Sequence, residues 1–316
     1  MNTEGETLFQ DSFAQPEIRC GYYVSDSMKK VWAIELDLIR KFVEVCDKHG
    51  LRYFMDGGTL LGAVRHQGFI PWDDDADMIM PREDYNKLWN VAAEEFKEPY
   101  FFQTTLSEDR FFRTHAQLRN SLTTGFVEED REKDINKGIY IDIFVLDNIP
   151  DGFFKKQWWR IKIELEKKIL SFQYDRKYNT LSLRGKLFYC FVHFFFATIP
   201  FKKFFERFNL KTLGRYMNVR TEYVGDVTLD WRTNVQWPSA WFEDYVYLPF
   251  ETLMLRAPIF YEDVLSKQYG DYRKLPEDVS APGLRSHGSV VFEPDVPYKE
   301  YLKETADNKQ KGRYAL

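Results

Sequence analysis

The sequence is poor in cysteine and has no apolar run long enough to cross a membrane. Its three cysteines, Cys20, Cys46 and Cys190, are widely spaced and form no CxxC pair, which excludes a disulfide-bonded scaffold and a cysteine zinc site. We therefore expect a protein of the reducing cytoplasm. The longest apolar run, residues 187–199, has 13 residues, whereas a spanning helix needs about 20. Residues 1–10 are polar and acidic, so a secretory signal is not expected.

The composition is that of a folded chain with many aromatic residues. Of its 316 residues, 44% are hydrophobic, 17% aromatic and 29% charged, which excludes disordered, collagenous and low-complexity proteins. Because single cores stop growing near about 250 to 300 residues, the length predicts two domains or one enlarged domain.

Charge is distributed unevenly along the sequence. The chain carries −5 overall, but residues 151–220 contain 16 basic and five acidic residues, a net charge of +11, so the remainder carries −16. A mildly acidic chain is not expected to bind nucleic acid, which requires clustered basic residues over a whole domain. A local basic and aromatic stretch instead predicts contact with an anionic surface, such as the inner leaflet of the plasma membrane.

The first half of the chain predicts alternating helices and strands. Apolar residues recur at helical spacing over residues 28–49, with Ser25 or Ser27 as the N-cap. A strand over 52–56 follows, and after a glycine pair the sequence predicts a helix over 59–65 and a strand over 75–80. Further expected elements are a helix over 81–97 and strands over 100–103, 116–119, 123–127 and 139–146. This order predicts an α+β or α/β core.

The second half changes in character. Residues 153–220 predict long basic, aromatic helices, and a strand over 245–255 and a helix from Pro258 to Tyr269 follow, with a loop over 270–288. We expect three parts: a catalytic core (1–150), an inserted helical subdomain (151–222), and a C-terminal part (223–316) that completes the core and the substrate site.

Two aspartates of the predicted strand over 75–80 are candidate metal ligands. Asp75 and Asp77 are two residues apart, so in a strand both side chains project from one face, about 6 to 7 Å apart. Two carboxylates so placed repel each other, and a divalent cation relieves the repulsion. Hard oxygen ligands select Mg²⁺ or Mn²⁺ over zinc.

A glycine pair precedes this strand in the sequence. Gly57 and Gly58 lie between a predicted strand and a predicted helix, where backbone N–H groups can cradle an anion that a side chain would exclude. Alone, the pair predicts only a tight turn. Followed by Asp75 and Asp77, it predicts an anion cradle beside a metal site.

A third carboxylate is needed to complete the metal shell. Asp142 lies within an apolar strand, where an ionised group is costly unless it is paired; the alternative is a salt-bridged structural aspartate. Asp147, at the strand end, has the character of a turn or cap residue. A calcium loop starting at Asp73 is excluded, because its sixth and twelfth positions are Met78 and Asp84 instead of Gly and Glu.

Several segments together resemble one family. Residues 57–80, with the succession GGTLLG, Arg, IPWDDD and Asp-x-Asp, strongly resemble the LicD/fukutin-type phosphotransferases. The resemblance continues over residues 118–124, 140–147, 269–272 and 275–276 and so covers most of the chain. It implies a nucleotidyltransferase-like fold, related to that of polymerase β, with a mixed sheet flanked by helices.

The resemblance also implies an activity. Asp75, Asp77 and Asp142 match the catalytic, metal-binding carboxylates of the family, with Mg²⁺ or Mn²⁺ as cofactor. Bacterial members move phosphocholine from CDP-choline to a surface glycan precursor, and eukaryotic relatives use CDP-ribitol. Two features depart from the family: Gln117 stands where many bacterial relatives have Lys, and the zinc-binding cysteines of some eukaryotic relatives are missing, so no zinc is expected.

Other residues are candidates for contact with substrate. The candidate donor or phosphate-binding residues are Gly57, Gly58, Thr59, Arg65, Asp73 and Arg119. The candidate substrate contacts are Trp72, Asp74, His115, Gln117, Tyr269 and Asp271. Either arginine is equally well explained as a structural or surface residue, and Trp72 as a core residue. His66, His115 and His287 are candidate acids or bases, with solvated or core histidines as the alternative.

Aromatic and basic residues interleave in the predicted helical part. These are Trp158, Trp159, Phe194, Phe195, Phe196 and Phe201, with Lys155, Lys156, Lys202 and Lys203. The pattern predicts either an interfacial surface that lies on an anionic membrane or solvated basic helices with an aromatic core. Aromatic faces also suit the quaternary ammonium of choline.

The functional prediction is a cytoplasmic, peripherally membrane-associated phosphotransferase. It would use Mg²⁺ to transfer an alcohol phosphate, with phosphocholine from CDP-choline favoured, to a surface glycan or teichoic-acid-type acceptor. One alternative is a glycosyltransferase that uses a sugar nucleotide and takes Asp75 and Asp77 as its metal motif. Another is a non-catalytic membrane adaptor on the same fold.

Overall fold

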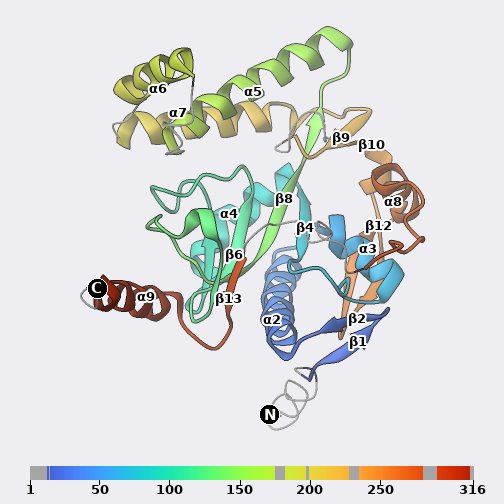
Figure 1. The fold of residues 1–316 in the computed structure, drawn as a ribbon. Coiled ribbons are helices and arrows are strands. Elements are labelled where there is room, and N and C mark those ends of the chain that lie inside the picture. Colours follow the sequence, from blue (N-terminus) through green and yellow to red (C-terminus); the bar gives the residue numbers. More distant parts are fainter. Residues whose placement is uncertain are drawn as a thin grey trace.

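The computed structural model describes residues 13, 15–174, 182–196, 199–227, 235–279 and 290–313. A mixed sheet lies at the centre, a long helix packs beside it, and three helices form a layer at one end of the molecule (Figure 1). The fold is thus a mixed α/β arrangement, as the sequence predicts.

In the part of the chain that the structure describes, the central sheet has seven strands. β10, β9, β8, β4 and β3 are neighbours in that order, and β6 joins β8 and carries β5. Their bounds are β3 Phe54–Met55, β4 Asp77–Pro81, β5 Tyr100–Gln103, β6 Ala116–Asn120, β8 Ile139–Ile149, β9 Tyr223–Gly225 and β10 Gln236–Pro238. β4 runs parallel to β8, whereas β6 and β9 run antiparallel to it. β8 therefore links both halves of the chain into one sheet.

Helix α2 (Asp26–Lys48) packs against β6 and β8. It begins at Ser25, whose hydroxyl accepts a hydrogen bond from the amide of Met28 at 3.2 Å, as is typical of an N-cap. Its apolar stripe, including Trp32 and Phe42, is fully buried. Helix α3 (Gly57–His66) starts directly at the glycine pair, two residues earlier than predicted, and α4 (Arg82–Glu95) follows β4.

Residues 245–255 form a hairpin, so the prediction of one continuous strand was wrong. β11 (Tyr245–Phe250) turns at Glu251 and pairs antiparallel with β12 (Leu253–Pro258). Glu251 adopts a left-handed φ of 51°, and its carboxylate binds Arg19 and the amide of Phe69. The turn has no glycine, so its sequence carries no ordinary turn pattern. Pro258 ends β12. Helix α8 (Tyr261–Tyr269) therefore begins three residues later than predicted.

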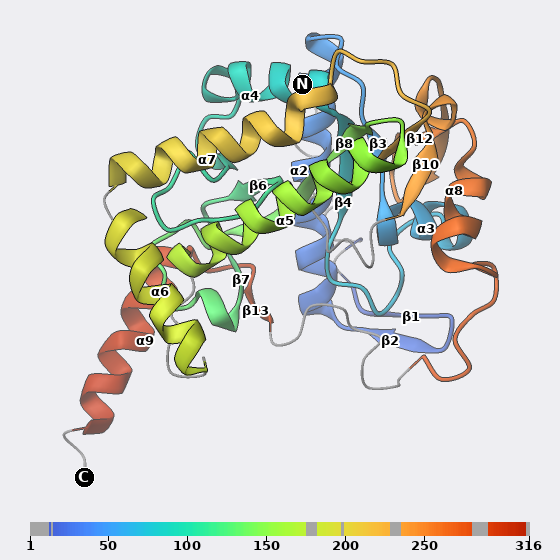
Figure 2. The ribbon, with the colours of Figure 1, turned by 90° about the horizontal axis from the view of Figure 1, so that it is seen from above.

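Three helices, α5 (Phe153–Tyr174), α6 (Leu183–Phe196) and α7 (Ile199–Leu213), form the layer at the end of β8, which we call the helical layer (Figure 2). α5 packs against both α6 and α7. The helical layer has a small apolar cluster, separate from the main core, that includes Trp159, Ile163 and Leu213. Within the described residues, no helix is both long and apolar enough to cross a membrane.

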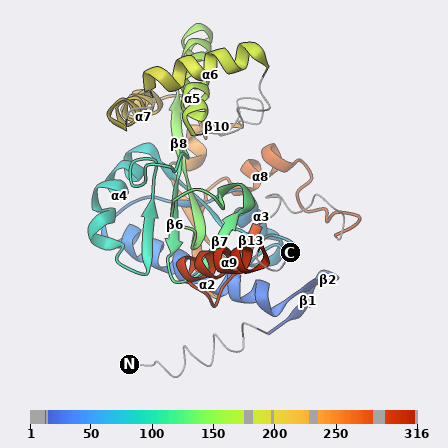
Figure 3. The ribbon, with the colours of Figure 1, turned by 60° about the vertical axis from the view of Figure 1, so that its left-hand side comes forward.

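The remaining elements lie around the sheet. β1 (Glu17–Arg19) and β2 (Tyr22–Val24) form a hairpin beside α2, and β7 (Thr124–Val127) pairs with β13 (Val290–Glu293), near the C-terminal helix α9 (Tyr298–Arg313) (Figure 3). Short 3-10 turns among the described residues are Glu128–Asp130, Gly214–Tyr216 and Ser239–Phe242. Residues beyond 222 thus supply β9 and β10 to the central sheet and pair with β7.

Candidate active site

Three aspartates from two neighbouring strands meet at one point of the sheet. Asp77 opens β4 and stands directly opposite Asp142 of β8 in the parallel register, while Asp75 precedes the strand. One carboxylate oxygen of each lies within 4.8 Å of the others. Backbone bonds fix the pair: the amide of Asp142 donates to the carbonyl of Ala76 at 2.9 Å, and the amide of Asp77 donates to Thr59 Oγ1 at 2.7 Å.

The three carboxylates are electrostatically unfavourable as they stand. Burial, and then the charges of Asp75 and Asp142, raise the pKa of Asp77 well above its usual range. Repelling carboxylates with oxygens this close have the geometry and the hard oxygen donors that a small divalent cation requires. The residues present therefore fit Mg²⁺ or Mn²⁺.

Two side chains of the β6 region hold Asp142. Gln117 Nε2 donates to Asp142 Oδ1 at 2.8 Å, and His115 Nε2 lies 3.1 Å from the same oxygen. Burial alone would raise the pKa of Asp142, but the charge and hydrogen bond of His115 and the bond from Gln117 bring it below its usual value. The His115 ring lies 4.5 Å from that of Phe144. Asp142 is thus oriented by groups that favour its ionised form.

Arg119, expected to clamp phosphate, is engaged inside the protein instead. Its buried guanidinium donates to Gln103, to the carbonyls of Gly125 and Gly138, and to Gln117 Oε1 at 2.5 Å. Four of its five N–H groups are used in this way. Arg119 therefore orients Gln117, which in turn binds Asp142.

The glycine pair brings backbone and carboxylates into close approach. A Cβ on Gly58 would lie 2.5 Å from Asp73 Oδ2, and one on Gly57 would lie 3.0 Å from Asp77 Oδ2. Gly57 also has a left-handed φ of 49°, which side chains disfavour. The start of α3 thus faces two carboxylates of the site, where the sequence predicts an anion from the substrate.

Three further predicted contacts lie on or next to α3: Arg65, Trp72 and Tyr269. Arg65 donates to the carbonyl of Tyr272 at 3.2 Å and lies over the Trp72 ring, 5.9 Å from its centre. Trp72 is buried and packs against His66, so it is a core residue here. The Tyr269 hydroxyl lies close to the acidic centre, because a Cβ on Gly57 would be 3.9 Å from it and 3.0 Å from Asp77 Oδ2. Burial and the charges of Asp56 and Asp77 raise the pKa of Tyr269.

The other predicted contacts differ in position. Asp73 and Asp74 form a second acidic group with Asp75. Asp271 is exposed and follows α8. His66 contacts Cys20 Sγ at 3.6 Å. Burial and the charge of Arg65 lower the pKa of His66 to about 4, so the His66 side chain is neutral at pH 7. His287 lies outside the described residues.

Glu35 lies near the acidic centre but was not predicted from the sequence. This residue of α2 is almost fully buried, and its Oε2 has no hydrogen-bond partner within the described part of the protein. Burial, and then the charge of Asp75 followed by those of Asp74 and Asp73, raise its pKa well above 4.5. A glutamate at helical spacing from Val31 and Leu38, on the apolar face of α2, is the pattern that would have identified it.

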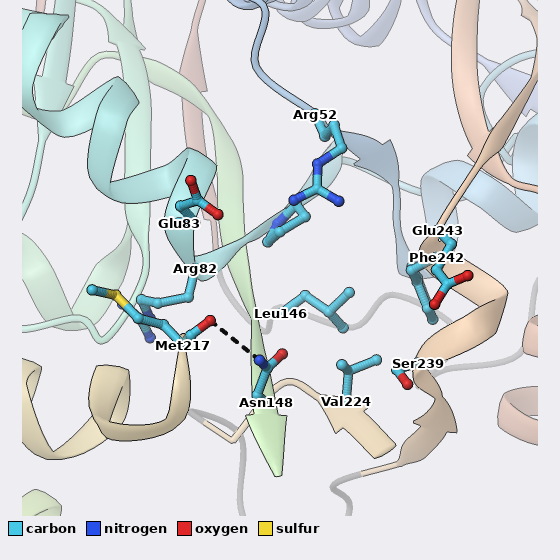
Figure 4. Close-up of a pocket in the computed structure, with 11 residues that line it drawn as sticks. Arg52, Arg82, Glu83, Leu146, Asn148, Met217, Val224, Ser239, Phe242 and Glu243 are labelled. Carbon is cyan, nitrogen blue, oxygen red and sulfur yellow. Dashed lines mark hydrogen bonds between the residues drawn. The ribbon is translucent and has the colours of Figure 1, made fainter. Parts of the chain in front are cut away.

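A separate hollow lies at the opposite end of β4 and β8. It has a volume of about 200 Å³ and is lined by Arg52, Arg82 and Asn148, among others (Figure 4). Arg52 Nε donates to Asp84 at 2.8 Å, and Arg82 binds Asp147 through two bonds. Asn148 donates to backbone carbonyls, including that of Met217. The charged groups that line this hollow are paired within the protein, and the three carboxylates lie elsewhere.

Fold and site together define a mixed α/β protein with a three-carboxylate centre suited to a divalent cation. Residues 50–170 match the family described as LicD/FKTN/FKRP, nucleotidyltransferase domain. The resemblance to this family expected from the sequence is therefore confirmed over this stretch. The matched stretch contains Asp75, Asp77 and Asp142 together with His115 and Gln117.

The similarity to one named relative extends beyond this stretch, and two others match over a shorter one. The chain is 28% identical over 265 residues to the lipopolysaccharide cholinephosphotransferase LicD of Haemophilus influenzae, which covers 77% of this chain and 90% of that protein. It is 36% identical over 87 residues to the ribitol 5-phosphate transferase FKRP of mouse and of human. That match covers 26% of this chain and 18% of either relative.

Proposed function

We propose that this protein transfers an alcohol phosphate, specifically phosphocholine from CDP-choline, to a hydroxyl of a surface glycan or teichoic-acid-type precursor, with release of CMP. The observation that carries the proposal is the convergence of Asp75, Asp77 and Asp142 at one point of the sheet. The similarity to a lipopolysaccharide cholinephosphotransferase over 90% of that relative supports the donor group and the kind of acceptor.

The transfer exchanges the phosphoanhydride bond of the donor for a phosphoester bond to the acceptor. An acceptor hydroxyl oxygen attacks the phosphorus that bears choline, the bond from that phosphorus to the bridging oxygen breaks, and CMP leaves with this oxygen. The hydroxyl proton must pass to a base. Mg²⁺, held by Asp75, Asp77 and Asp142, would neutralise charge on the diphosphate.

Side chains of the protein position the reacting groups and accept the proton of the acceptor hydroxyl. We assign Asp142 to accept the proton of the attacking hydroxyl, because its Oδ1 is held by His115 and Gln117 and its orientation is thereby fixed. Arg119 acts through Gln117 and so belongs to the positioning residues. Tyr269, whose hydroxyl lies near Gly57 as Asp77 does, would contact the substrate.

The test offers purified protein a panel of CDP-alcohols and UDP-sugars with Mg²⁺ and follows the phosphorus NMR signals of the released nucleotides. CMP released from CDP-choline, and only when a glycan acceptor is present, is the expected result. UDP released from a sugar nucleotide would replace the proposal with a glycosyltransferase. Absence of turnover with every donor would favour the adaptor alternative.

A further inference from the structure

Helix α5 carries an apolar stripe that faces solvent. Phe154 is 85% exposed and Trp158 is 73% exposed, and Ile161 and Leu165 are each more than half exposed. These four residues follow one another at steps of four, three and four, so they lie on one face of the helix. An exposed row of large apolar side chains is unusual on a protein surface and marks a site of interaction.

The same helix buries a different stripe. Trp159, Ile163 and Leu170 are at most 3% exposed and follow at steps of four and seven. Trp159 donates from its indole N–H to the carbonyl of Thr212 at 2.9 Å, so the prediction that Trp159 belongs to an interfacial surface was wrong. Because this second stripe already packs against α7, packing of α5 within the protein does not account for the exposed stripe.

Helix α6 repeats the pattern. Leu183, Leu187, Phe191 and Phe194 follow at steps of four, four and three, and all are more than half exposed. On α7, Phe204 is also exposed. The side chains of Phe195, Phe196, Phe201 and Lys202 lie outside those that the structure describes.

Basic residues accompany the apolar ones. Lys155, Lys168, Arg184 and Arg207 are exposed on the three helices, and residues 151–220 carry a net charge of +11. A symmetric dimer through this face would bring two such segments together and repel. An anionic lipid surface attracts each basic group and accommodates aromatic rings at the headgroup level.

We propose that the helical layer docks on the surface of an anionic lipid bilayer, with the exposed stripe of α5 inserted among the lipid headgroups. The layer forms one end of the molecule (Figures 1 and 2), so nothing in the described core stands between it and a flat surface. Docking depends on surface chemistry alone and is independent of the transfer reaction.

Co-sedimentation with vesicles tests the proposal. The full chain is mixed with vesicles of phosphatidylcholine, with or without phosphatidylglycerol, at low and at high salt. The protein is expected to pellet with the anionic vesicles and to be released by salt, because ionic screening weakens the attraction. In the double variant Phe154→Ser/Trp158→Ser the partition coefficient should fall at least about tenfold, since two large apolar side chains no longer enter the lipid.

Matched variants separate this effect from misfolding. Ile18→Ser/Tyr23→Ser removes two similarly exposed apolar residues from the β1–β2 hairpin and should bind vesicles like the wild type. Ile161→Ser/Leu165→Ser, on the same stripe of α5, should reproduce the loss if Phe154→Ser/Trp158→Ser fails to fold. Circular dichroism establishes that each variant is folded.

Three results would overturn docking on lipid. The first is wild-type protein that stays in the supernatant with anionic vesicles at low salt. The second is a folded Phe154→Ser/Trp158→Ser variant that pellets as well as the wild type. The third is a wild-type dimer, seen by sedimentation velocity without lipid, that the same variant dissociates, because the stripe would then join two copies of the chain.

Discussion

The acidic centre and the helical layer invert the usual distribution of side chains in opposite ways. At the centre, carboxylates that ordinarily face water are withdrawn from it next to one another, as with the buried Asp142 and the partly buried Asp77. In the layer, aromatic side chains that ordinarily pack inside face water, as with Phe154 and Trp158. Each inversion costs stability in the isolated chain, and each would be relieved by the partner proposed above, a cation in one case and lipid in the other.

The largest expected effect breaks the acidic centre. Asp77→Asn removes a ligand and should lower kcat at least about 1000-fold, equivalent to about 4 kcal/mol. Because burial and like charges raise the pKa of Asp77, the carboxyl costs stability once the pH rises above its unfolded value of 3.8. The free energy of unfolding at pH 8 without divalent cation should therefore increase. Urea denaturation and CMP release measure the two quantities.

The exposed Asp263→Asn on α8 serves as the control for this variant. It should leave kcat within about twofold of the wild type. Retained turnover in Asp77→Asn would show that the centre is not catalytic.

Two isoleucines on α5 allow the buried stripe and the exposed stripe of this helix to be compared by the same substitution. Ile163 is 1% exposed and Ile161 is 59% exposed. Ile163→Ala should lower the free energy of unfolding by about 3 kcal/mol through lost packing, whereas Ile161→Ala should change it by less than about 0.5 kcal/mol. Thermal and urea denaturation measure both, and equal losses would mean that the outer stripe packs inside the protein.

Gly58 tests how closely the backbone must approach the carboxylates. Gly58→Ala places a methyl group 2.5 Å from Asp73 Oδ2 and must displace that carboxylate. We expect kcat/KM to fall about 30-fold, equivalent to about 2 kcal/mol. Gly214→Ala, where the nearest atom is an ordinary 3.6 Å away, is the control. Unchanged kinetics in Gly58→Ala would remove Asp73 from the site.

Glu35 should give the smallest effect, and a pH-dependent one. Because burial and the neighbouring aspartates raise its pKa, the wild type loses stability as the pH rises above the unfolded value of 4.5. Glu35→Gln should match the wild type at pH 4 and gain about 1 kcal/mol at pH 8. Urea denaturation at both pH values measures this. The exposed Glu44→Gln on the same helix should show no such gain.

Local pattern predicted much of the centre. Alternation in the strand beginning near Asp75, and the ionisable Asp142 inside an apolar strand, were enough to predict that the three carboxylates converge. Helix α2 followed from periodicity and an N-cap in the same way. The helical character predicted for residues 153–220 is confirmed over α5, α6 and α7.

Contacts between distant segments could not be predicted in this way. Gln117 meets Asp142 because β6 pairs antiparallel with β8 in one particular register, and no local pattern specifies that register. The same holds for Arg119, whose four acceptors come from four segments. The turn at Glu251 was not predicted, because its left-handed residue is not a glycine and is stabilised by distant partners.

The length of strand β8 sets the distance between the acidic centre and the helical layer. Asp142 lies near its beginning, its last residue is Ile149, and α5 starts four residues later. Seven residues of extended chain span about 23 Å at about 3.3 Å per residue. With the helical layer resting on a bilayer, the strand would hold the reacting groups roughly 2 nm above the lipid. An acceptor anchored in that bilayer would then be modified on sugars some way out from its anchor, and the strand would act as a spacer that selects which sugar is reached.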